Sequence, residues 1–504
     1  MKFEPAFNGF AEAYDRGEPQ VVWTSLVADV ETPVSAFLKL ARGKPYSFVL
    51  ESVEGGAVRG RYSFIGLEPD LIWRCQGNTA EINRDALDKE DAFAPCPVAE
   101  AEGAIASLRS LVAESRIDLP DGLPPMSAGL VGYAAYDTVR LVEDIPDTNP
   151  DTLGIPDGVF IRPTVMAVFD TIKDVISIFT PVWPRDGVDA QNAYGIAVER
   201  LRRIVGDFDT PLPEAARAHP EQDVPALTPA SNMTPGDFHA MIEKGKEYIK
   251  AGDVFQVVLS QRFSVPFPYP PFALYRALRR LNPSPFLFFL DFGGFAIVGS
   301  SPEILVRMRE GKVTIRPIAG TRRRGKDAAE DQELANDLLT DPKELAEHLM
   351  LLDLGRNDVG RVAETGTVKV TEQFNIENYS HVMHIVSNVE GTLKPELDAL
   401  DALYAGFPAG TVSGAPKVRA MEIIDELENV RRGVYAGCIG YFGADGDMDS
   451  CIALRTAVVK DDTMYVQAGG GVVHDSSPEG EYQESVNKSR ALIRAAEEAV
   501  KFAG

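Results

Sequence analysis

Short runs of β-branched and aromatic residues, separated by turn residues, recur through the N-terminal part of the chain. They occupy residues 46–50, 62–65, 165–169 and 175–179. Runs of this kind, bounded by polar and glycine-containing segments, are typical of β-strands. Between them, residues 102–114 follow the spacing of a helix with one apolar face. The pattern therefore predicts strands interrupted by single helices.

The pattern changes at residues 207–235. This segment is rich in proline and alanine and shows no sustained period, which is typical of a linker. It separates an N-terminal region, residues 1–206, from a C-terminal region, residues 236–504, each of domain size or slightly larger. We expect strands of both regions to share one core.

Two capped helices stand out in the C-terminal region, one beginning at Thr234-Pro235 and the other at Asp341-Pro342. Their expected buried stripes are Phe238, Met241 and Ile242 on the first helix and Leu345, Leu349 and Leu352 on the second. Strands are predicted at residues 254–263, 286–292, 295–298, 312–317, 437–442, 451–459 and 464–468. Because strands and helices do not alternate regularly, the fold class is α+β rather than a doubly wound sheet.

The amino-acid composition excludes some classes of function. The chain has 504 residues, 45% of them hydrophobic and 25% charged, as in ordinary globular proteins. Its four cysteines lack metal-type spacing, and its N-terminus lacks an apolar signal segment, so we expect a soluble cytoplasmic protein with reduced thiols and no membrane partner. The net charge of −25 argues against nucleic acid as a partner. An anionic substrate would need a local basic or N–H-rich pocket.

The stretch that ends near Lys488 provides such a pocket. A strand-like run contains Arg455, a glycine turn follows at Gly469–Gly471, and a helix opening at Ser477 carries Glu484. Arginine can bind a carboxylate through two parallel hydrogen bonds, and glycine N–H groups can approach an anion closely. Glutamate can ligate Mg²⁺. These parts predict a site for a small dianion beside a metal; the alternative is a glycine-rich hairpin followed by a solvated helix.

Four shorter motifs precede this stretch. Residues 316–321 end a strand in a glycine turn, residues 343–351 carry Glu347, residues 379–384 present a histidine after an aromatic residue, and residues 410–417 form a glycine-punctuated polar turn. Glu347 lies at the edge of an apolar stripe, where it is either a metal ligand or a solvated neighbour of the core. Each motif is weak by itself.

In this order and spacing the motifs resemble the chorismate-utilising enzymes, most closely those of the anthranilate synthase branch. The resemblance runs from about Val49 to the C-terminus and is highly specific over residues 255–488. It implies a large mixed or antiparallel β-sandwich core flanked by helices. It also implies a Mg²⁺-dependent amination of chorismate with ammonia, followed by loss of pyruvate to give anthranilate, the first committed step of tryptophan biosynthesis.

The resemblance also implies roles for individual residues. The metal ligands would be Glu347 and Glu484, and the catalytic residues Glu303 as general acid, His384 in pyruvate elimination, and Thr411. The substrate-binding residues would be Gly320, Thr321, Tyr435, Arg455, Gly469, Gly470, Gly471 and Lys488.

Two positions distinguish relatives within the family. Isochorismate and salicylate synthases place a lysine that activates water where this chain has Gln256, and aminodeoxychorismate synthases often place a nucleophilic lysine where it has Ala319. A neutral amide cannot deprotonate water, and alanine cannot attack the ring. Both residues favour anthranilate formation. The alternatives are those two relatives or, from a different class, a non-catalytic amino-acid sensor.

The resemblance finally implies regulation and a partner. Tryptophan would bind a feedback site formed by Glu51, Ser52, Pro285, Phe286, Leu287, Ile439, Gly440 and Tyr441. The sequence shows no Cys–His–Glu amidotransferase arrangement, so ammonia is expected from a separate glutamine amidotransferase subunit, in a hetero-oligomer of two large and two small subunits.

Overall fold

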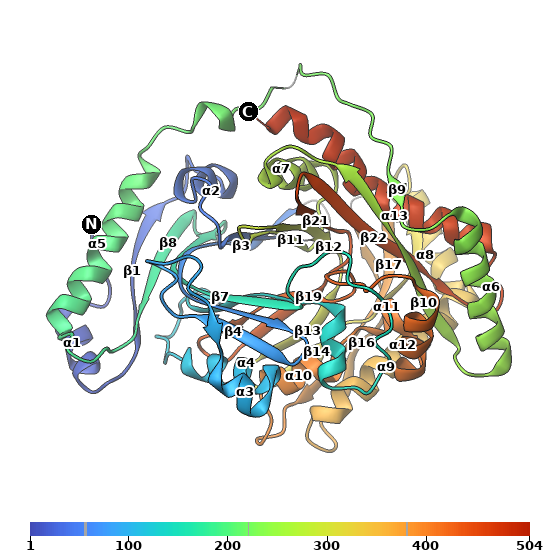
Figure 1. The fold of residues 1–504 in the computed structure, drawn as a ribbon, viewed down its shortest axis with the longest axis horizontal. Coiled ribbons are helices and arrows are strands. Elements are labelled where there is room, and N and C mark those ends of the chain that lie inside the picture. The colour runs from blue at the N-terminus through green and yellow to red at the C-terminus, as the bar shows by residue number, and fades with distance from the viewer. Residues whose placement is uncertain (55–57, 220, 380–381, 504) are drawn as a thin grey trace.

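The computed structural model describes residues 1–54, 58–219, 221–379 and 382–503. Its centre is one extended sheet in which every described strand pairing is antiparallel. The sheet divides at β3 and β7 into two arms that face each other, with helices packed on the outside (Figure 1). The structure thus confirms the prediction of an α+β fold with a large antiparallel β core.

The first arm joins strands from both sides of residues 207–235. In order across the sheet they are β3 (Val58–Gln76), β2 (Ser47–Glu54), β11 (Phe286–Asp291), β12 (Ala296–Ser301), β21 (Thr456–Lys460), β22 (Thr463–Val472) and β10 (Gln256–Pro266). The short strands β9 (Ala230–Ser231) and β18 (Gly414–Ala415) add to β10.

The second arm has the same mixed origin. It runs through β7 (Gly158–Asp170), β6 (Gly129–Ala134), β19 (Cys438–Gly443), β20 (Met448–Ile452), β13 (Ile304–Arg309), β14 (Lys312–Ile315) and β17 (Val382–Thr392). β15 (Ile318–Arg323) and β16 (Lys369–Asn378) both pair with β17. The remaining strands are β1 (Gln20–Val27), β8 (Val175–Val182), β4 (Thr79–Asn83) and β5 (Ala94–Pro95).

Three large hydrophobic cores hold these layers together, beside two smaller clusters, among the described residues. The space between the arms is filled by residues from both, including Phe48 and Phe288 of the first arm and Val131 and Ile439 of the second. In the second core α2 (Pro33–Leu40), α7 (Pro271–Leu281) and α13 (Pro478–Glu498) pack on the outer face of the first arm, and α1 (Phe7–Asp15) and α5 (Ala190–Phe208) pack against β1 and β8. The third core involves α3 (Pro97–Glu102), α4 (Ala104–Glu114), α6 (Pro235–Ala251), α9 (Pro342–Val362), α10 (Ala399–Gly406), α11 (Gly410–Ser413) and α12 (Lys417–Leu427).

The two helix caps form as the sequence predicts. The Thr234 hydroxyl accepts from the Asp237 N–H and the Asp237 carboxylate accepts from the Thr234 N–H, a complete capping box. Asp341 accepts from the N–H groups of Lys343 and Glu344. The predicted stripe of α9 is partly wrong. Leu349 is 48% exposed and His348 is fully buried, because the helix turns its buried face toward α10 and β17.

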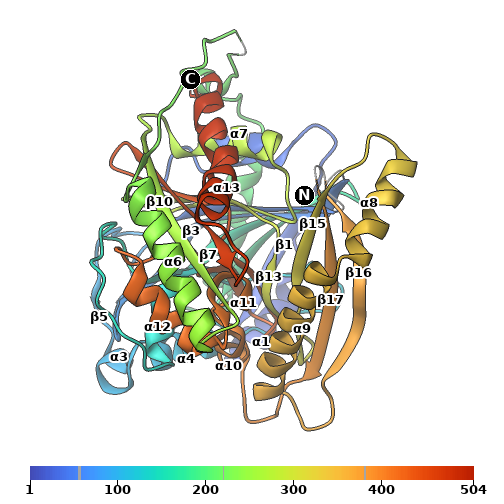
Figure 2. The same ribbon diagram turned by 90° about the vertical axis from the view of Figure 1, so that its right-hand side faces the viewer.

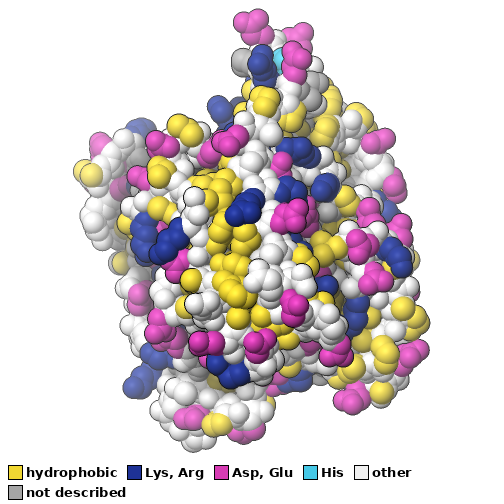
Figure 3. Space-filling view, turned by 90° about the vertical axis from the view of Figure 1, so that its left-hand side faces the viewer, with side chains coloured by type: hydrophobic (Ala, Val, Ile, Leu, Met, Phe, Trp, Pro, Cys, Tyr) yellow, Lys and Arg dark blue, Asp and Glu magenta, His cyan; other side chains and the backbone are white. Residues whose placement is uncertain are grey.

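Two features concern the surface. No helix in the described ranges combines the length and apolar composition needed to cross a lipid bilayer. On the face that carries α1 and α5, hydrophobic side chains form a stripe bordered by both basic and acidic groups (Figure 3). The negative net charge is therefore not concentrated on that face.

Candidate active site

The predicted site residues converge where the far ends of the two arms come together. Figure 2 shows α6 and α13 on one side of this region and α9 with α8 (Ala328–Thr340) on the other. Direct contact links the sides, because Gln256 on β10 donates to Glu347 on α9, with 3.1 Å between Nε2 and Oε1. The substrate, metal and catalytic candidates can therefore be considered as one site.

Glu303 follows β12 and is almost completely buried. Burial raises the pKa of its carboxyl to about 8, although the Thr411 hydroxyl and the Ile318 N–H both donate to it. The Thr411 Oγ1 atom lies 3.2 and 3.3 Å from the two carboxyl oxygens. At neutral pH Glu303 is therefore mostly protonated, which is the state that a general acid requires.

His384 on β17 lies opposite Thr321 on β15. Its Nδ1 is 3.1 Å from the Gly320 carbonyl oxygen and 3.1 Å from the Thr321 hydroxyl. Since a carbonyl only accepts, Nδ1 carries the proton and Nε2 has the free lone pair. Burial lowers the pKa of the imidazole to about 4, so the ring is neutral at pH 7. His384 has the form of a base.

Gly320 itself occupies a bulge rather than the turn expected from the sequence. It lies inside β15, where the register with β17 shifts, and its φ is +68°. Only glycine adopts this conformation without strain. The bulge directs the Gly320 carbonyl at His384, a contact that fixes the imidazole tautomer.

Arg455 occupies a crossing between the arms. The predicted strand 451–459 is in fact two strands: β20 belongs to the second arm and β21 to the first, and the chain passes between them with Arg455 at φ +48°. Periodicity did not reveal the break because both sides of this run are buried. The guanidinium forms no ion pair with any described residue, and burial lowers its pKa. It remains cationic and can bind an incoming carboxylate.

Gly469, Gly470 and Gly471 lie within β22 rather than in a turn, paired with β10. A Cβ at Gly470 would come within 2.4 Å of Glu481 Oε2, and one at Gly471 within 2.2 Å of Gln256 Nε2. Glycine is required because other side chains lie directly on the strand. Lys488 on α13 donates to the Gly469 carbonyl at 2.9 Å, which fixes the helix against this surface.

The acidic groups of the site repel one another. Burial raises the pKa of Glu347, and the charges of Glu344 and Glu484 raise it further. The pKa of Glu481 is likewise raised by burial and by Glu484. Glu484 pairs with Lys488 at 2.7 Å, whereas Glu481 Oε2 is buried and has no hydrogen-bond partner among the described residues. Clustered carboxylates with an unpartnered oxygen suit a hard cation.

The donor set therefore fits Mg²⁺. In the described ranges no group of three acidic, histidine or cysteine side chains is arranged to hold a metal alone. Mg²⁺ does not require one, because it commonly takes one or two carboxylates and completes its shell with water and substrate oxygens. Glu481, to which the sequence analysis assigned no role, precedes Glu484 by three residues on α13, and this helical spacing was the available signal.

Tyr435 and Tyr379 border the same region. Tyr435 is buried beside Arg432, and burial raises the pKa of its phenol to about 12, so the hydroxyl keeps its proton. Tyr379, the aromatic residue of the 379–384 motif, packs edge-on against His384 with 5.3 Å between the ring centres. Its hydroxyl donates to Glu377, which also pairs with Arg316.

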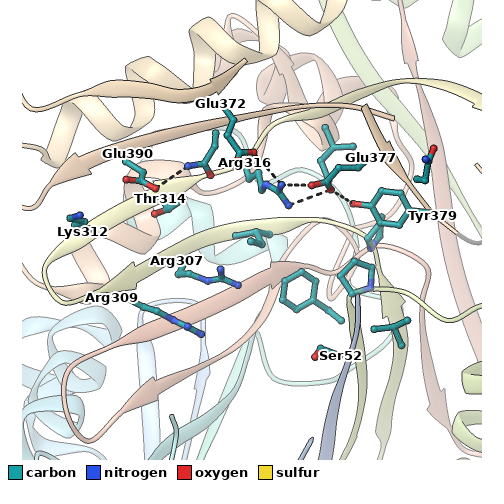
Figure 4. Close-up of a pocket in the computed structure, with 18 of the residues that line it drawn as sticks. Ser52, Arg307, Arg309, Lys312, Thr314, Arg316, Glu372, Glu377, Tyr379 and Glu390 are labelled. Carbon is teal, nitrogen blue, oxygen red and sulfur yellow. Dashed lines mark hydrogen bonds and ion pairs between the residues drawn. The ribbon is translucent and has the colours of Figure 1, made fainter. Parts of the chain in front are cut away.

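A separate cavity of about 370 Å³ lies between the arms, away from these residues. It is lined by Glu51, Ser52, Phe286, Leu287, Ile439, Gly440 and Tyr441, seven of the eight residues assigned to regulation. Pro285 instead lines an adjoining cavity of about 990 Å³. In that larger cavity Figure 4 shows Ser52, Arg307 and Arg309 on one wall and Arg316, Glu377 and Tyr379 on the other.

The chain is similar to proteins of one known family. A family model described as chorismate binding enzyme matches residues 64–494. The chain is 57% identical over 498 residues to anthranilate synthase component 1 of Cereibacter sphaeroides, covering 99% of this chain and 98% of the relative. It is 46% identical over 479 residues to the component 1 of Aquifex aeolicus, covering 94% of each.

Comparison with solved structures leads to the same family. Anthranilate synthase component I from Streptococcus pneumoniae TIGR4 superposes with a TM-score of 0.73 at 39% identity, over 86% of this chain and 92% of that one. The menaquinone-specific isochorismate synthase from Escherichia coli superposes with a TM-score of 0.69 at 20% identity, over 97% and 98% of the two chains. This second likeness shows a shared fold.

Proposed function

This chain belongs to the family of chorismate binding enzymes, and we propose that it converts chorismate and ammonia into anthranilate and pyruvate, the first committed step of tryptophan biosynthesis. One observation carries the proposal: a carboxyl with a pKa of about 8 and an imidazole with a pKa of about 4 lie in the same site. At neutral pH the site thus offers one protonated acid and one neutral base, as an amination followed by an elimination requires.

The charged groups of the site account for the proposed binding of the two substrate carboxylates. Glu347 and Glu484 would hold Mg²⁺, which when bound neutralises and orients the ring carboxylate of chorismate. The second carboxylate would bind the guanidinium of Arg455, which has no ion-pair partner in the described part of the chain, through two parallel hydrogen bonds. Together these contacts overcome the repulsion that a chain of net charge −25 exerts on a dianion.

In the first step Glu303 gives its proton to the C4 hydroxyl, which leaves as water. Ammonia adds at C2 as the ring double bonds shift, and loss of one proton from the new ammonium leaves the amine, aminodeoxyisochorismate. Gln256 supports ammonia as the nucleophile, because its amide donates to Glu347 and cannot act as a base toward water.

In the second step the free Nε2 of His384 removes the C2 proton. The bond from C3 to the enolpyruvyl oxygen breaks, pyruvate leaves after its methylene carbon takes up a proton, and the ring becomes aromatic. The Gly320 carbonyl keeps the proton on Nδ1 and so keeps Nε2 available.

A separate glutamine amidotransferase subunit is the proposed source of ammonia, in an assembly of two large and two small subunits. All four cysteines are buried thiols, and burial raises the pKa of Cys438 to about 12. Such thiols do not supply the thiolate that glutamine hydrolysis needs. The name component 1 in the relatives supports a second component. Tryptophan is the proposed feedback inhibitor, in the cavity between the arms.

The purified chain, incubated with chorismate, Mg²⁺ and ammonium at alkaline pH, should form anthranilate and pyruvate in equal amounts, measured by fluorescence and mass. Glutamine should replace ammonium only after an amidotransferase subunit is added. Accumulation of isochorismate would instead indicate water as nucleophile, and a 4-amino product would indicate aminodeoxychorismate synthesis. Absence of any chorismate turnover, with tryptophan still bound, would favour an amino-acid sensor.

A further inference from the structure

A buried ion pair lies next to the active site and takes no part in the proposed reaction. The side chains of Arg432 and Glu428 are only 1% and 2% exposed. Nε and Nη2 of Arg432 donate to the two carboxylate oxygens of Glu428 at 2.9 and 2.6 Å. Although burial lowers the pKa of Arg432, the charge of Glu428 and its hydrogen bonds raise that pKa above its ordinary value, so the pair is ionised. A buried ion pair adds little stability by itself, because removing both charges from water offsets their attraction.

Arg432 also binds two elements that carry site residues. Its Nη1 donates to the Val412 carbonyl on α11, and its Nη2 donates to the Val258 carbonyl on β10, each at 2.7 Å. The guanidinium lies over the Tyr435 ring as well, 5.4 Å from the ring centre. One side chain can make all these contacts because arginine has five N–H donors in a fixed planar arrangement. Arg432 therefore joins α11, β10 and Tyr435.

The helix α11 depends on an outside contact of this kind. It has only four residues, Gly410–Ser413, and a helix of a single turn is not stable by itself. The last carbonyl groups of any helix lack partners within the helix, and a cation near them is favourable. Arg432 meets both needs by donating to the Val412 carbonyl. Because Thr411 directly precedes Val412, the same contact fixes the backbone from which the Thr411 side chain projects.

Thr411 in turn contacts the acid of the proposed reaction. Its hydroxyl donates to both oxygens of the Glu303 carboxyl, at 3.2 and 3.3 Å, and this contact lowers the pKa of Glu303. None of the contacts that Arg432 makes with described residues reaches Glu303 itself, so its influence on the acid passes through Thr411. The other charged or titratable groups near Glu303 are Lys488, Tyr379, Arg316 and Asp358.

We propose that Arg432 is a positioning residue of the active site, which holds the Thr411 hydroxyl against Glu303 by fixing the Val412 carbonyl. This inference rests on the proposed role of Glu303 as the acid, and it adds a buried residue that the sequence analysis did not single out. Glu428 has the matching part. It fixes the guanidinium, and its Oε1 accepts from the N–H and the hydroxyl of Ser260 on β10 at 2.9 and 2.7 Å.

Replacing Arg432 with lysine tests the proposal in the full chain. Lysine keeps the positive charge beside Glu428, but its single ammonium cannot replace the planar set of contacts that includes Val412. The decline of activity at high pH should therefore move upward by about 0.5–1 pH unit, because Glu303 loses the hydrogen bond from Thr411. At pH 7 kcat with ammonia should fall about tenfold, because the acid is less well positioned.

The matched control is Arg162→Lys. Arg162 is also a buried arginine, and it binds the two oxygens of Asp70 at 2.8 and 2.9 Å and lies over the ring of Trp183. None of these partners is a site residue. A general effect of placing lysine in a buried arginine pair would appear in this variant too, whereas we expect its pH profile to match that of the wild type.

Two double variants separate the position of Thr411 from folding. Thr411→Val combined with Arg432→Lys should shift the pH profile no further than Thr411→Val alone, because both changes break the same contact. Glu428→Gln combined with Arg432→Met removes both charges and leaves no unpaired buried ion, so it should fold and show the shift of Arg432→Lys. An unshifted profile in Arg432→Lys or in this second double variant, or additive shifts in the first, would overturn the proposal.

The protonation of Glu303 can also be measured without turnover. Infrared difference spectra of the chain without chorismate should contain a protonated carboxyl band that Glu303→Gln lacks, and this band should titrate at higher pH in Arg432→Lys. If the wild type forms no anthranilate but the band shifts in this way, the proposed reaction fails and the inference stands. If anthranilate forms while the band and the activity profile stay unshifted in Arg432→Lys, the inference fails and the reaction stands.

Discussion

Replacing Glu303 with glutamine tests the acid on which the proposed chemistry depends. The substitution keeps the shape of the side chain and removes its ability to protonate the leaving hydroxyl. A positioned general acid contributes about 10²–10⁴-fold to rate, so kcat with ammonia should fall by that factor. The KM for chorismate should change little, because Arg455 and the two glutamates that bind the substrate are untouched.

The burial of Glu303 also predicts a pH-dependent stability difference. Its pKa is raised from 4.5 to about 8 in the folded chain. Between these values the folded chain holds a proton that the unfolded chain has lost, so stability falls as pH rises through this window. One pH unit corresponds to about 1.4 kcal/mol, and pH 7 lies about 2.5 units above the lower value. Glu303→Gln should therefore gain about 3 kcal/mol over wild type between pH 4.5 and pH 7.

Two measurements check this reasoning. Urea denaturation of wild type and Glu303→Gln at pH 5 and pH 7 gives the stability difference, and anthranilate fluorescence at constant free ammonia gives kcat/KM against pH. Wild-type activity should decline above about pH 8 as Glu303 ionises. Thr411→Val is a useful control: because the Thr411 hydrogen bond lowers the pKa of Glu303, its loss should move this decline to higher pH.

The reasoning would be refuted by a Glu303→Gln enzyme with wild-type turnover. A stability difference that does not grow with pH would show that Glu303 is ionised in the folded protein, and another group would have to supply the proton.

Two further predictions concern the metal and the inhibitor. Glu347→Gln and Glu484→Gln should each abolish turnover at ordinary Mg²⁺ with the circular dichroism spectrum preserved, because losing one of the two proposed charged ligands weakens Mg²⁺ binding and misplaces the ion relative to the substrate carboxylate; near-normal activity in either variant would remove that residue from the metal site. Ser52→Phe should fill the cavity between the arms and raise the tryptophan concentration for half-inhibition more than tenfold with basal activity nearly unchanged; a fully tryptophan-sensitive variant would leave Ser52 with a structural role only.

The sequence by itself determined the features that depend on near neighbours. The caps of α6 and α9 were predictable because Thr234 and Asp341 bind N–H groups two or three residues away. The α+β class followed from the local periodicity of apolar residues. Glu303, His384 and Arg455 were identified as site residues because their motifs resemble those of a known family. In each case the information lies in a few consecutive residues or in a motif.

Tertiary structure decided the features that depend on residues far apart in the chain. Gln256 meets Glu347 across 91 positions, and Tyr275 meets Glu51 across 224. The strand break at Arg455 arises because the chain passes there from the second arm to the first. Glycines are needed in β22 because side chains from α13 and β10 lie directly on that strand. The periodicity of apolar residues indicates which side of a helix or strand is buried, but it does not indicate which segment packs against that side. The packing partner is set by how distant segments of the chain come together.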